Sequence, residues 1–352
     1  ADTDQGTLAI QLDPSLAVTT IDALDYLKNF PHQCIEQTVS RFLPNVMNYR
    51  ALTQLGVNDP ELEKNLREAL DLGITKLREG QNPDGGWGWF GGMESNPLVT
   101  AYAVLGLAEA HNAGYDIDTV MIDAGALFLT GYYFAPDEDT SLWMLNRLAF
   151  LYYVTGRYGN SAYSPSQGNL DALFNVRLEM SIYAKAYLLR TYLDLYPGAS
   201  DQSAALVSDL ITSAKLSATG AHWEEEFHDW WNWNTDVRST SIVLAALIQA
   251  DPNSDLLPNA VRWLMVARQG DHWTTTQETT WSVMALTDWM LATNELQGNY
   301  DFALALNGTE QTSGTITPEN VRDGQKLEIA VGDLLLDELN RMTVIRSEGE
   351  GA

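Results

Sequence analysis

Apolar residues recur at helical spacing through the middle of the chain. In the segment 61–77, apolar residues lie three or four residues apart on one helix face, at Leu62, Leu66, Leu70, Ile74 and Leu77. The same pattern predicts about ten to twelve helices in all. The further predicted helices cover residues 35–55, 97–111, 117–130, 139–155, 170–195, 202–216, 236–250, 256–269 and 277–293.

The two ends of the chain have a strand-like pattern instead. Residues 7–12 and 300–306 alternate or are rich in strand-forming residues, and Asn307-Gly308 is a strong hairpin signal. Residues 326–331 and 342–345 resemble them. We therefore expect residues 1–18 and 299–352 to form one small β unit, which the chain leaves and re-enters around a helical domain at 19–298.

A loop containing Gly and Trp recurs between predicted helices. The copies are Gly85-Gly86-Trp87, Gly220-Ala221-His222-Trp223 and Gly270-Asp271-His272-Trp273. Each loop leads into an apolar helix that begins near Thr or Ser. Such helix–loop–helix units cannot bury their apolar faces alone and must stack on their neighbours. The repeats predict an α/α toroid of about six helical hairpins, with an open helical solenoid as the alternative architecture.

Composition narrows the possible functions. The chain has 352 residues, and 20 basic against 47 acidic residues give a net charge of −27. Nucleic acid is excluded as a partner, because phosphate binding requires clustered Lys and Arg. The single Cys excludes an internal disulfide and a cysteine-based zinc site. No apolar stretch reaches 18 residues, so we expect no membrane insertion.

The single cysteine, Cys34, lies three residues before Gln37 at the predicted start of a helix. A lone Cys in such a place is commonly a small buried hydrophobe. At this spacing, however, the thiol and the carboxamide share one helix face. They can form an internal thioester with loss of ammonia, leaving an acyl group open to an outside nucleophile. Glu36 between them favours the helix start through the helix dipole.

These residues resemble a known family. Cys34-Ile35-Glu36-Gln37 resembles the C-x-E-Q thioester signature of the α2-macroglobulin and complement C3 superfamily, and its context is most similar to that of the bacterial α2-macroglobulins. Gly85-Gly86-Trp87-Gly88-Trp89 and Thr276-Gln277-Glu278-Thr279-Thr280 are similar to other segments of the family's thioester domain. The terminal β segments resemble the CUB-like domain that hosts it. The family usually has Gly before the Cys, and here Gln33 stands there.

The resemblance implies a covalent trap for proteases rather than an enzyme with turnover. After activation, the thioester would acylate a nucleophile, most simply a lysine amine, on a captured protease. The remaining macroglobulin domains would be further partners, the site would be extracytoplasmic (periplasmic, secreted or at the cell envelope of a bacterium), and no cofactor besides the Cys–Gln cross-link would be needed.

The resemblance also implies residues that modulate or shield the thioester. Some members use a His on a later helix to attack the thioester first. The matching helix here, at 141–153, holds Asn146 and no His, which favours amines as nucleophiles. His111 could take that role from elsewhere, and His32 is interpreted as a local hydrogen-bonding residue. The shielding aromatic side chains would be Trp87, Trp89 and Phe90, although each could simply pack in the core.

Three other functions remain open from the sequence. A terpene-cyclase-like toroid would need an acidic motif, for which Asp137-Glu138-Asp139-Thr140 is an incomplete match. A glycosidase could use Glu224, Glu225, Glu226 and Asp229 beside several tryptophans, and His222, His228 and Asp229 could in principle hold a metal. The third is a structural scaffold with an inert Cys34.

Overall fold

The chain forms two compact units in the computed structural model, which describes residues 6–57, 60–334 and 339–347. The helical unit is Ala23–Trp289, and the β unit combines Ala1–Asp22 with Met290–Ala352. The sequence-based boundaries were 18/19 and 298/299. The outermost residues of both predicted β segments, 1–5 and 348–352, lie outside the described residues.

The described residues contain twelve α-helices, so the predicted mainly α fold is confirmed. They are α1 (Leu16–Asn29), α2 (Ile35–Gln54), α3 (Pro60–Gly80), α4 (Pro97–Asn112), α5 (Thr119–Thr130), α6 (Leu142–Tyr158), α7 (Gln167–Asn175), α8 (Ile182–Leu195), α9 (Ser200–Thr212), α10 (Asp236–Ala250), α11 (Leu256–Ala267) and α12 (Thr276–Thr293). No helix among these residues is long and apolar enough to cross a membrane.

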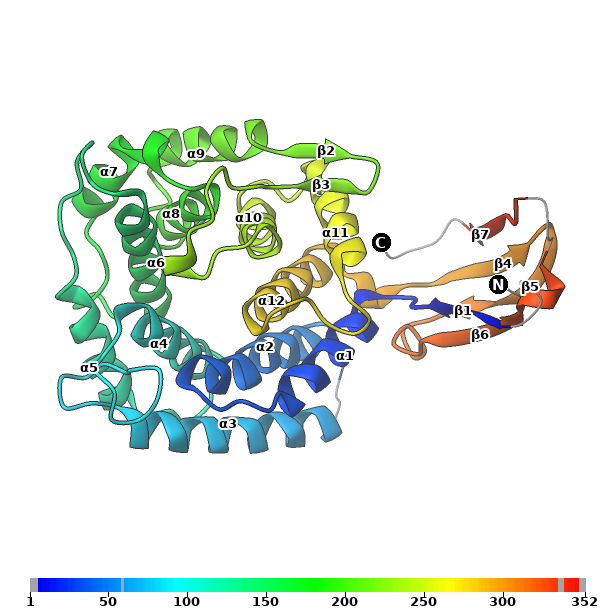
Figure 1. The fold of residues 1–352 in the computed structure, drawn as a ribbon, viewed down its shortest axis with the longest axis horizontal. Coiled ribbons are helices and arrows are strands. Elements are labelled where there is room, and N and C mark those ends of the chain that lie inside the picture. The colour runs from blue at the N-terminus through cyan, green and yellow to red at the C-terminus, as the bar shows by residue number, and fades with distance from the viewer. Residues whose placement is uncertain (1–5, 58–59, 335–338, 348–352) are drawn as a thin grey trace. The chain divides into compact units, whose positions relative to one another are not determined.

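Within the helical unit the even-numbered helices form an inner ring, and α3, α5, α7, α9 and α11 lie outside it (Figure 1). Burial follows this division. The inner helix α4 buries residues 98–110 without interruption. The outer helix α3 buries only Leu66, Leu70, Gly73, Leu77 and Gly80, the single face that its sequence pattern predicts. The α/α toroid is therefore the architecture of this unit.

Each of the three Trp loops joins an outer helix to the next inner helix in the same way. Trp87, Trp223 and Trp273 are fully buried. Each indole N–H donates to a carbonyl near the end of the preceding outer helix, and each Trp backbone N–H donates to a Thr hydroxyl of the following inner helix. The carbonyls belong to Leu77, Leu210 and Leu264, at 2.7, 2.7 and 2.9 Å, and the hydroxyls to Thr100, Thr240 and Thr279, at 2.8, 3.1 and 3.2 Å. The loops thus satisfy polar groups at helix ends that would otherwise be buried without partners.

Charged side chains join the C-terminal ends of the inner helices in what we call the rim network. Glu109 of α4 is fully buried and pairs with Arg157 of α6 at 2.7 Å and with Arg50 of α2 at 3.7 Å. Arg157 also pairs with Asp194 of α8 at 3.2 Å. Further members from α8, α10 and α12 are Arg190, Gln249 and Asp288. Cations at these helix ends also oppose the negative end of each helix dipole.

Two predictions for the helices were wrong in detail. The segment predicted as one helix, 170–195, breaks into α7, a short 3-10 helix at Arg177–Glu179 and α8. Side chains from other elements stabilise this break. Asn146 accepts the N–H of Ser181, and Glu225 accepts the next two N–H groups at the start of α8. Helix α1 was missed altogether.

The predicted helix 202–216 also runs too far. It ends earlier, as α9, and the chain turns into the short hairpin β2 (Lys215–Ser217) and β3 (Gly220–His222). Gly220 has φ +131°, and a Cβ there would lie 2.2 Å from the Asn259 carbonyl oxygen, so the hairpin requires glycine at this position.

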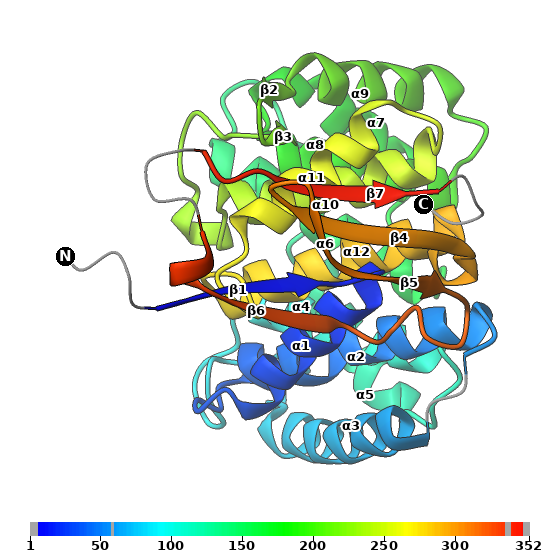
Figure 2. The same ribbon diagram turned by 90° about the vertical axis from the view of Figure 1, so that its right-hand side faces the viewer.

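The β unit pairs the two chain ends, as predicted. Strand β1 (Thr7–Leu12) lies antiparallel to β6 (Gln325–Ala330), and β4 (Tyr300–Leu306) lies between β5 (Thr309–Ile316) and β7 (Met342–Arg346) (Figure 2). Asn307 and Gly308, both with positive φ, form the predicted β4–β5 turn. The core of the unit contains Ile10, Leu304, Leu306 and Ile329.

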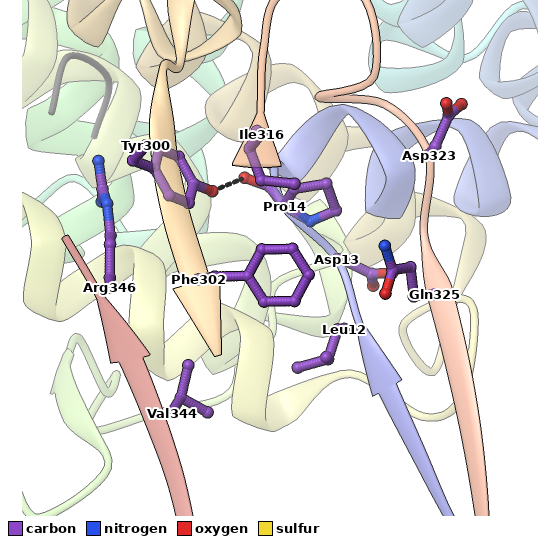
Figure 3. Close-up of a pocket in the computed structure, with 10 residues that line it drawn as sticks. All are labelled: Leu12, Asp13, Pro14, Tyr300, Phe302, Ile316, Asp323, Gln325, Val344 and Arg346. Carbon is purple, nitrogen blue, oxygen red and sulfur yellow. Dashed lines mark hydrogen bonds between the residues drawn. The ribbon is translucent and has the colours of Figure 1, made fainter. Parts of the chain in front are cut away.

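A pocket with about 520 Å³ of empty space opens in the β unit (Figure 3). Phe302 and Leu12 supply much of its apolar wall. The Tyr300 hydroxyl donates to the Pro14 carbonyl at 3.1 Å, and the Arg346 guanidinium lies 4.0 Å from the centre of the Tyr300 ring. None of the site residues predicted from sequence lines this pocket.

Candidate functional site

Cys34 and Gln37 form a closed turn at the start of α2. Cys34 is the N-cap residue, with an extended backbone (φ −69°, ψ 170°), and it is only 5% exposed. The side-chain Oε1 of Gln37 accepts the backbone N–H of Cys34 at 3.2 Å. The Cys34 carbonyl accepts both the N–H and the hydroxyl of Thr38, each at 2.9 Å. Because capping fixes both ends of this turn, the thiol and the carboxamide belong to one rigid local structure.

The thiol of Cys34 is held in its neutral form. Burial is the largest effect and raises its pKa. The backbone N–H of Gln37 opposes this, the charge of Glu36 raises the pKa further, and the net direction is upward. A free thiol here is therefore a weak nucleophile at neutral pH unless a neighbouring group removes its proton.

Glu36 lies at the centre of a buried hydrogen-bond cluster. Its Oε1 accepts the Ser40 hydroxyl at 2.8 Å, the Thr276 hydroxyl at 2.9 Å and the Gln277 side-chain amide at 2.8 Å. Thr276 and Gln277 start α12, about 240 residues along the chain from Glu36. Glu36 thereby joins the first inner helix to the last, beside Cys34. The other oxygen, Oε2, lies 4.0 Å from Cys34 Sγ.

Aromatic side chains gather next to this turn. The Trp89 carbonyl accepts the N–H of Ile35 at 2.9 Å, and the Trp89 ring lies 5.3 Å from the ring of Trp233. Trp233 also contacts Tyr102, with ring centres 5.9 Å apart, and the Tyr102 hydroxyl is 2.9 Å from that of Ser40. Trp233 was not among the residues predicted for the site.

The backbone of Trp233 is strained, because φ is +56°, a region that bulky residues rarely adopt. The loop is held in place by Asp229, whose Oδ2 accepts from Asn146, Tyr183 and Asn232 at 2.7, 3.0 and 2.7 Å.

The three aromatic residues predicted as shields have different surroundings. Trp87 is fully buried with its indole bonded to Leu77, which is a core position. Trp89 is 37% exposed and lies directly beside α2, as described above. Phe90 is 56% exposed on the same loop. Only Trp89 of the three combines contact with α2 and partial exposure.

The three predicted modulators differ in burial and in hydrogen-bond partners. Asn146 is fully buried near the start of α6, where its side chain bonds to Ser181 and Asp229. His111 is exposed in the last turn of α4, at the opposite end of that helix from the Trp loop. His32 is exposed, and its backbone carbonyl accepts from Arg41.

The residues behind the alternative functions have structural partners. Glu225 caps α8 and bonds to Ser239, and Asp229 holds the tryptophan loop. His222 bonds to Glu224 and stacks on Trp263. No group of three or more potential metal ligands occurs among the residues that the structure describes. The hydroxyl of Thr140 donates to Asp137 within an exposed turn.

Comparison with known proteins gives results consistent with this geometry. Residues 8–132 match the model of the A-macroglobulin TED domain. An α2-macroglobulin of Thermotoga maritima is 26% identical over 271 residues, which is 76% of this chain and 14% of that protein. Across the curated relatives that it matches, the chain spans 6% to 26% of their lengths.

Solved structures of that group share the fold. Native α2-macroglobulin from Escherichia coli, spanning domain MG7 to the C-terminus, aligns with a TM-score of 0.65 at 17% identity, covering 98% of this chain and 50% of that one. Salmonella α2-macroglobulin reacted with methylamine aligns with a TM-score of 0.64 at 18% identity, covering 92% of this chain and 21% of that one.

Proposed function

Because the chain carries a thioester domain of the α2-macroglobulin family, we propose that Cys34 and Gln37 form an internal thioester that captures proteases covalently. The observation that carries the proposal is the closed turn in which Gln37 Oε1 accepts the Cys34 N–H at 3.2 Å. In this turn the Gln37 carboxamide lies against the Cys34 backbone at a helix start, which supports the proposal.

The chemistry proceeds in two steps. In the first, Cys34 Sγ bonds to Cδ of Gln37, the Cδ–Nε2 bond breaks, and ammonia leaves. In the second, an amine attacks the same carbon, forms an amide and releases Cys34 as a thiol. Each chain can react once, so the protein would act as a single-use inhibitor rather than as an enzyme with turnover.

Access to the thioester must be limited before activation, since water would hydrolyse an exposed acyl group. Burial of Cys34 supports this requirement. We assign the shielding role to Trp89 together with Trp233, because these rings lie against each other beside α2. Phe90 and the buried Trp87 remain weaker candidates.

The partners and location follow from the family. Proteases are the proposed covalent targets, and lysine amines the proposed nucleophiles, since Asn146 rather than a His occupies the matching helix. The β unit is proposed to be part of a CUB-like domain in a larger macroglobulin, which would act outside the cytoplasm, in the periplasm or at the cell envelope.

Intact mass spectrometry of the 352-residue chain tests the thioester. The mass should lie about 17 Da below the sequence mass, and methylamine should add its own mass and release one thiol. The Cys34→Ala variant is the matched control and should show neither change. An unmodified wild-type mass with a thiol that is free before methylamine is added would overturn the proposal.

A further inference from the structure

Resting on the proposed thioester, we propose that Glu36 is a catalytic residue for its formation: its Oε2 accepts the thiol proton of Cys34 and delivers it to the departing ammonia. From its position in the C-x-E-Q motif alone, Glu36 is expected only to stabilise the start of α2. The side-chain contacts assign a more specific role.

The two oxygens of Glu36 have different surroundings. Oε1 accepts three hydrogen bonds, from Ser40, Thr276 and Gln277. Oε2 faces Cys34, with 4.0 Å between Oε2 and Sγ. Hydrogen bonds therefore fix Oε1, and Oε2 points toward the thiol of Cys34. A general base requires this arrangement.

The three donors fix the carboxylate from two sides. The Ser40 hydroxyl is itself bonded to Tyr102 at 2.9 Å, so it cannot turn away freely. The indole N–H of Trp281 donates to Oε1 of Gln277 at 3.2 Å, which directs the amide nitrogen of Gln277 toward Glu36. Thr276 and Gln277, at the start of α12, thus position the Glu36 carboxylate.

A base is needed because the thiol is not ionised by its surroundings. Burial and the Glu36 carboxylate both raise the pKa of Cys34. A carboxylate beside a thiolate would be unfavourable, whereas a carboxylate that takes the proton as sulfur attacks avoids two adjacent negative charges. His32, the nearest histidine in sequence, is on the exposed side of the preceding turn.

Atoms and charges balance in this step. As the proton moves from Sγ to Oε2, the sulfur electron pair forms the bond to Gln37 Cδ. When the tetrahedral centre collapses, the Cδ–Nε2 bond breaks, and the leaving nitrogen takes the proton from Glu36 to depart as ammonia. Glu36 returns to its ionised form, and the net products are the thioester and ammonia.

The Glu36→Gln variant tests this role, since its amide oxygen can still accept from the three donors. Unfolded chains, with Cys34 and Gln37 intact by mass, are refolded over a range of pH, and the loss of about 17 Da is followed with time. We expect Glu36→Gln to fold but to form the thioester at least about 100-fold more slowly than wild type. Glu68→Gln, which makes the same change on the exposed surface of α3, is the matched control and should stay within a few-fold of wild type.

The pH dependence distinguishes a base from a structural role, even if Glu36→Gln folds poorly. With Glu36 as the base, the wild-type rate should stay flat through neutral pH. If the free thiolate reacts without a base, the wild-type rate should instead keep rising about tenfold per pH unit through that range. That rise, or equal rates in wild type and Glu36→Gln, would overturn the role of Glu36. Failure of wild type to lose mass at all would overturn the proposed thioester itself.

Discussion

The rim network provides a sharp test of what holds the inner ring together. Replacing Arg157 by Gln leaves the buried carboxylate of Glu109 with Arg50 alone, at 3.7 Å and partly exposed. Breaking a buried ion pair by removing one partner costs about 3–5 kcal/mol, because the remaining charge stays desolvated. For a domain of this size the melting temperature should fall by roughly 6–20 °C.

Thermal and urea unfolding of the 352-residue chain measure this loss. Arg67→Gln is the matched control, because the Arg67–Glu63 pair is shorter, 2.6 Å, but its side chains are 61% and 35% exposed. We expect Arg67→Gln to change stability very little. The double variant Glu109→Gln with Arg157→Gln should recover most of the loss. If Arg157→Gln matches Arg67→Gln, or if the double variant is less stable than Arg157→Gln, the reasoning from burial is wrong.

Three further predictions concern single groups. Burial raises the pKa of Glu295 from 4.5 to about 7, so the folded state favours its neutral form. The free energy of unfolding of the β unit should therefore fall by about 3 kcal/mol as the pH rises from 4.5 to 7. In Glu295→Gln, the urea midpoint of unfolding should depend less on pH. Glycine adopts the positive φ of position 233 readily, so Trp233→Gly should leave the melting temperature nearly unchanged. The proposed thioester should hydrolyse faster in this variant, as measured by release of the Cys34 thiol. An unchanged rate of hydrolysis would exclude Trp233 as a shield. In Gln37→Ala, alkylation of Cys34 should have a pH midpoint above that of an ordinary cysteine, and adding Glu36→Gln should lower it.

The features that sequence predicts well here are local or repeated. The helix faces follow from a spacing of three or four residues. Helix α4 matches the prediction to within one residue, and α3 begins one residue earlier and ends three residues later than predicted. The Trp loops recur with the same chemistry, so three copies support one interpretation. Cys34 and Gln37 are three residues apart, and their meeting requires only that a helix begin at Ile35.

What sequence could not supply depends on contacts between distant segments. The break before α8 exists because Asn146 and Glu225 satisfy its first N–H groups from other elements, which no local pattern reveals. Trp233 belongs to the tryptophan-rich loop on which the glycosidase alternative depends. Its place beside Trp89 follows from ring closure, and its positive φ could not be expected for a bulky residue.

The position of Glu36 links the chemistry of the proposed thioester to completion of the fold. Two of the three donors that orient its carboxylate lie at the start of α12, the last inner helix, whereas Cys34 and Gln37 lie at the start of the first. The reacting pair can therefore meet early in folding, but its base is oriented only once α12 docks and the ring closes. A thioester formed before closure would stand in water without its shield and hydrolyse. With Glu36 as the base, formation waits for the structure that protects the product, and the refolding time course should show the mass loss after α12 has docked.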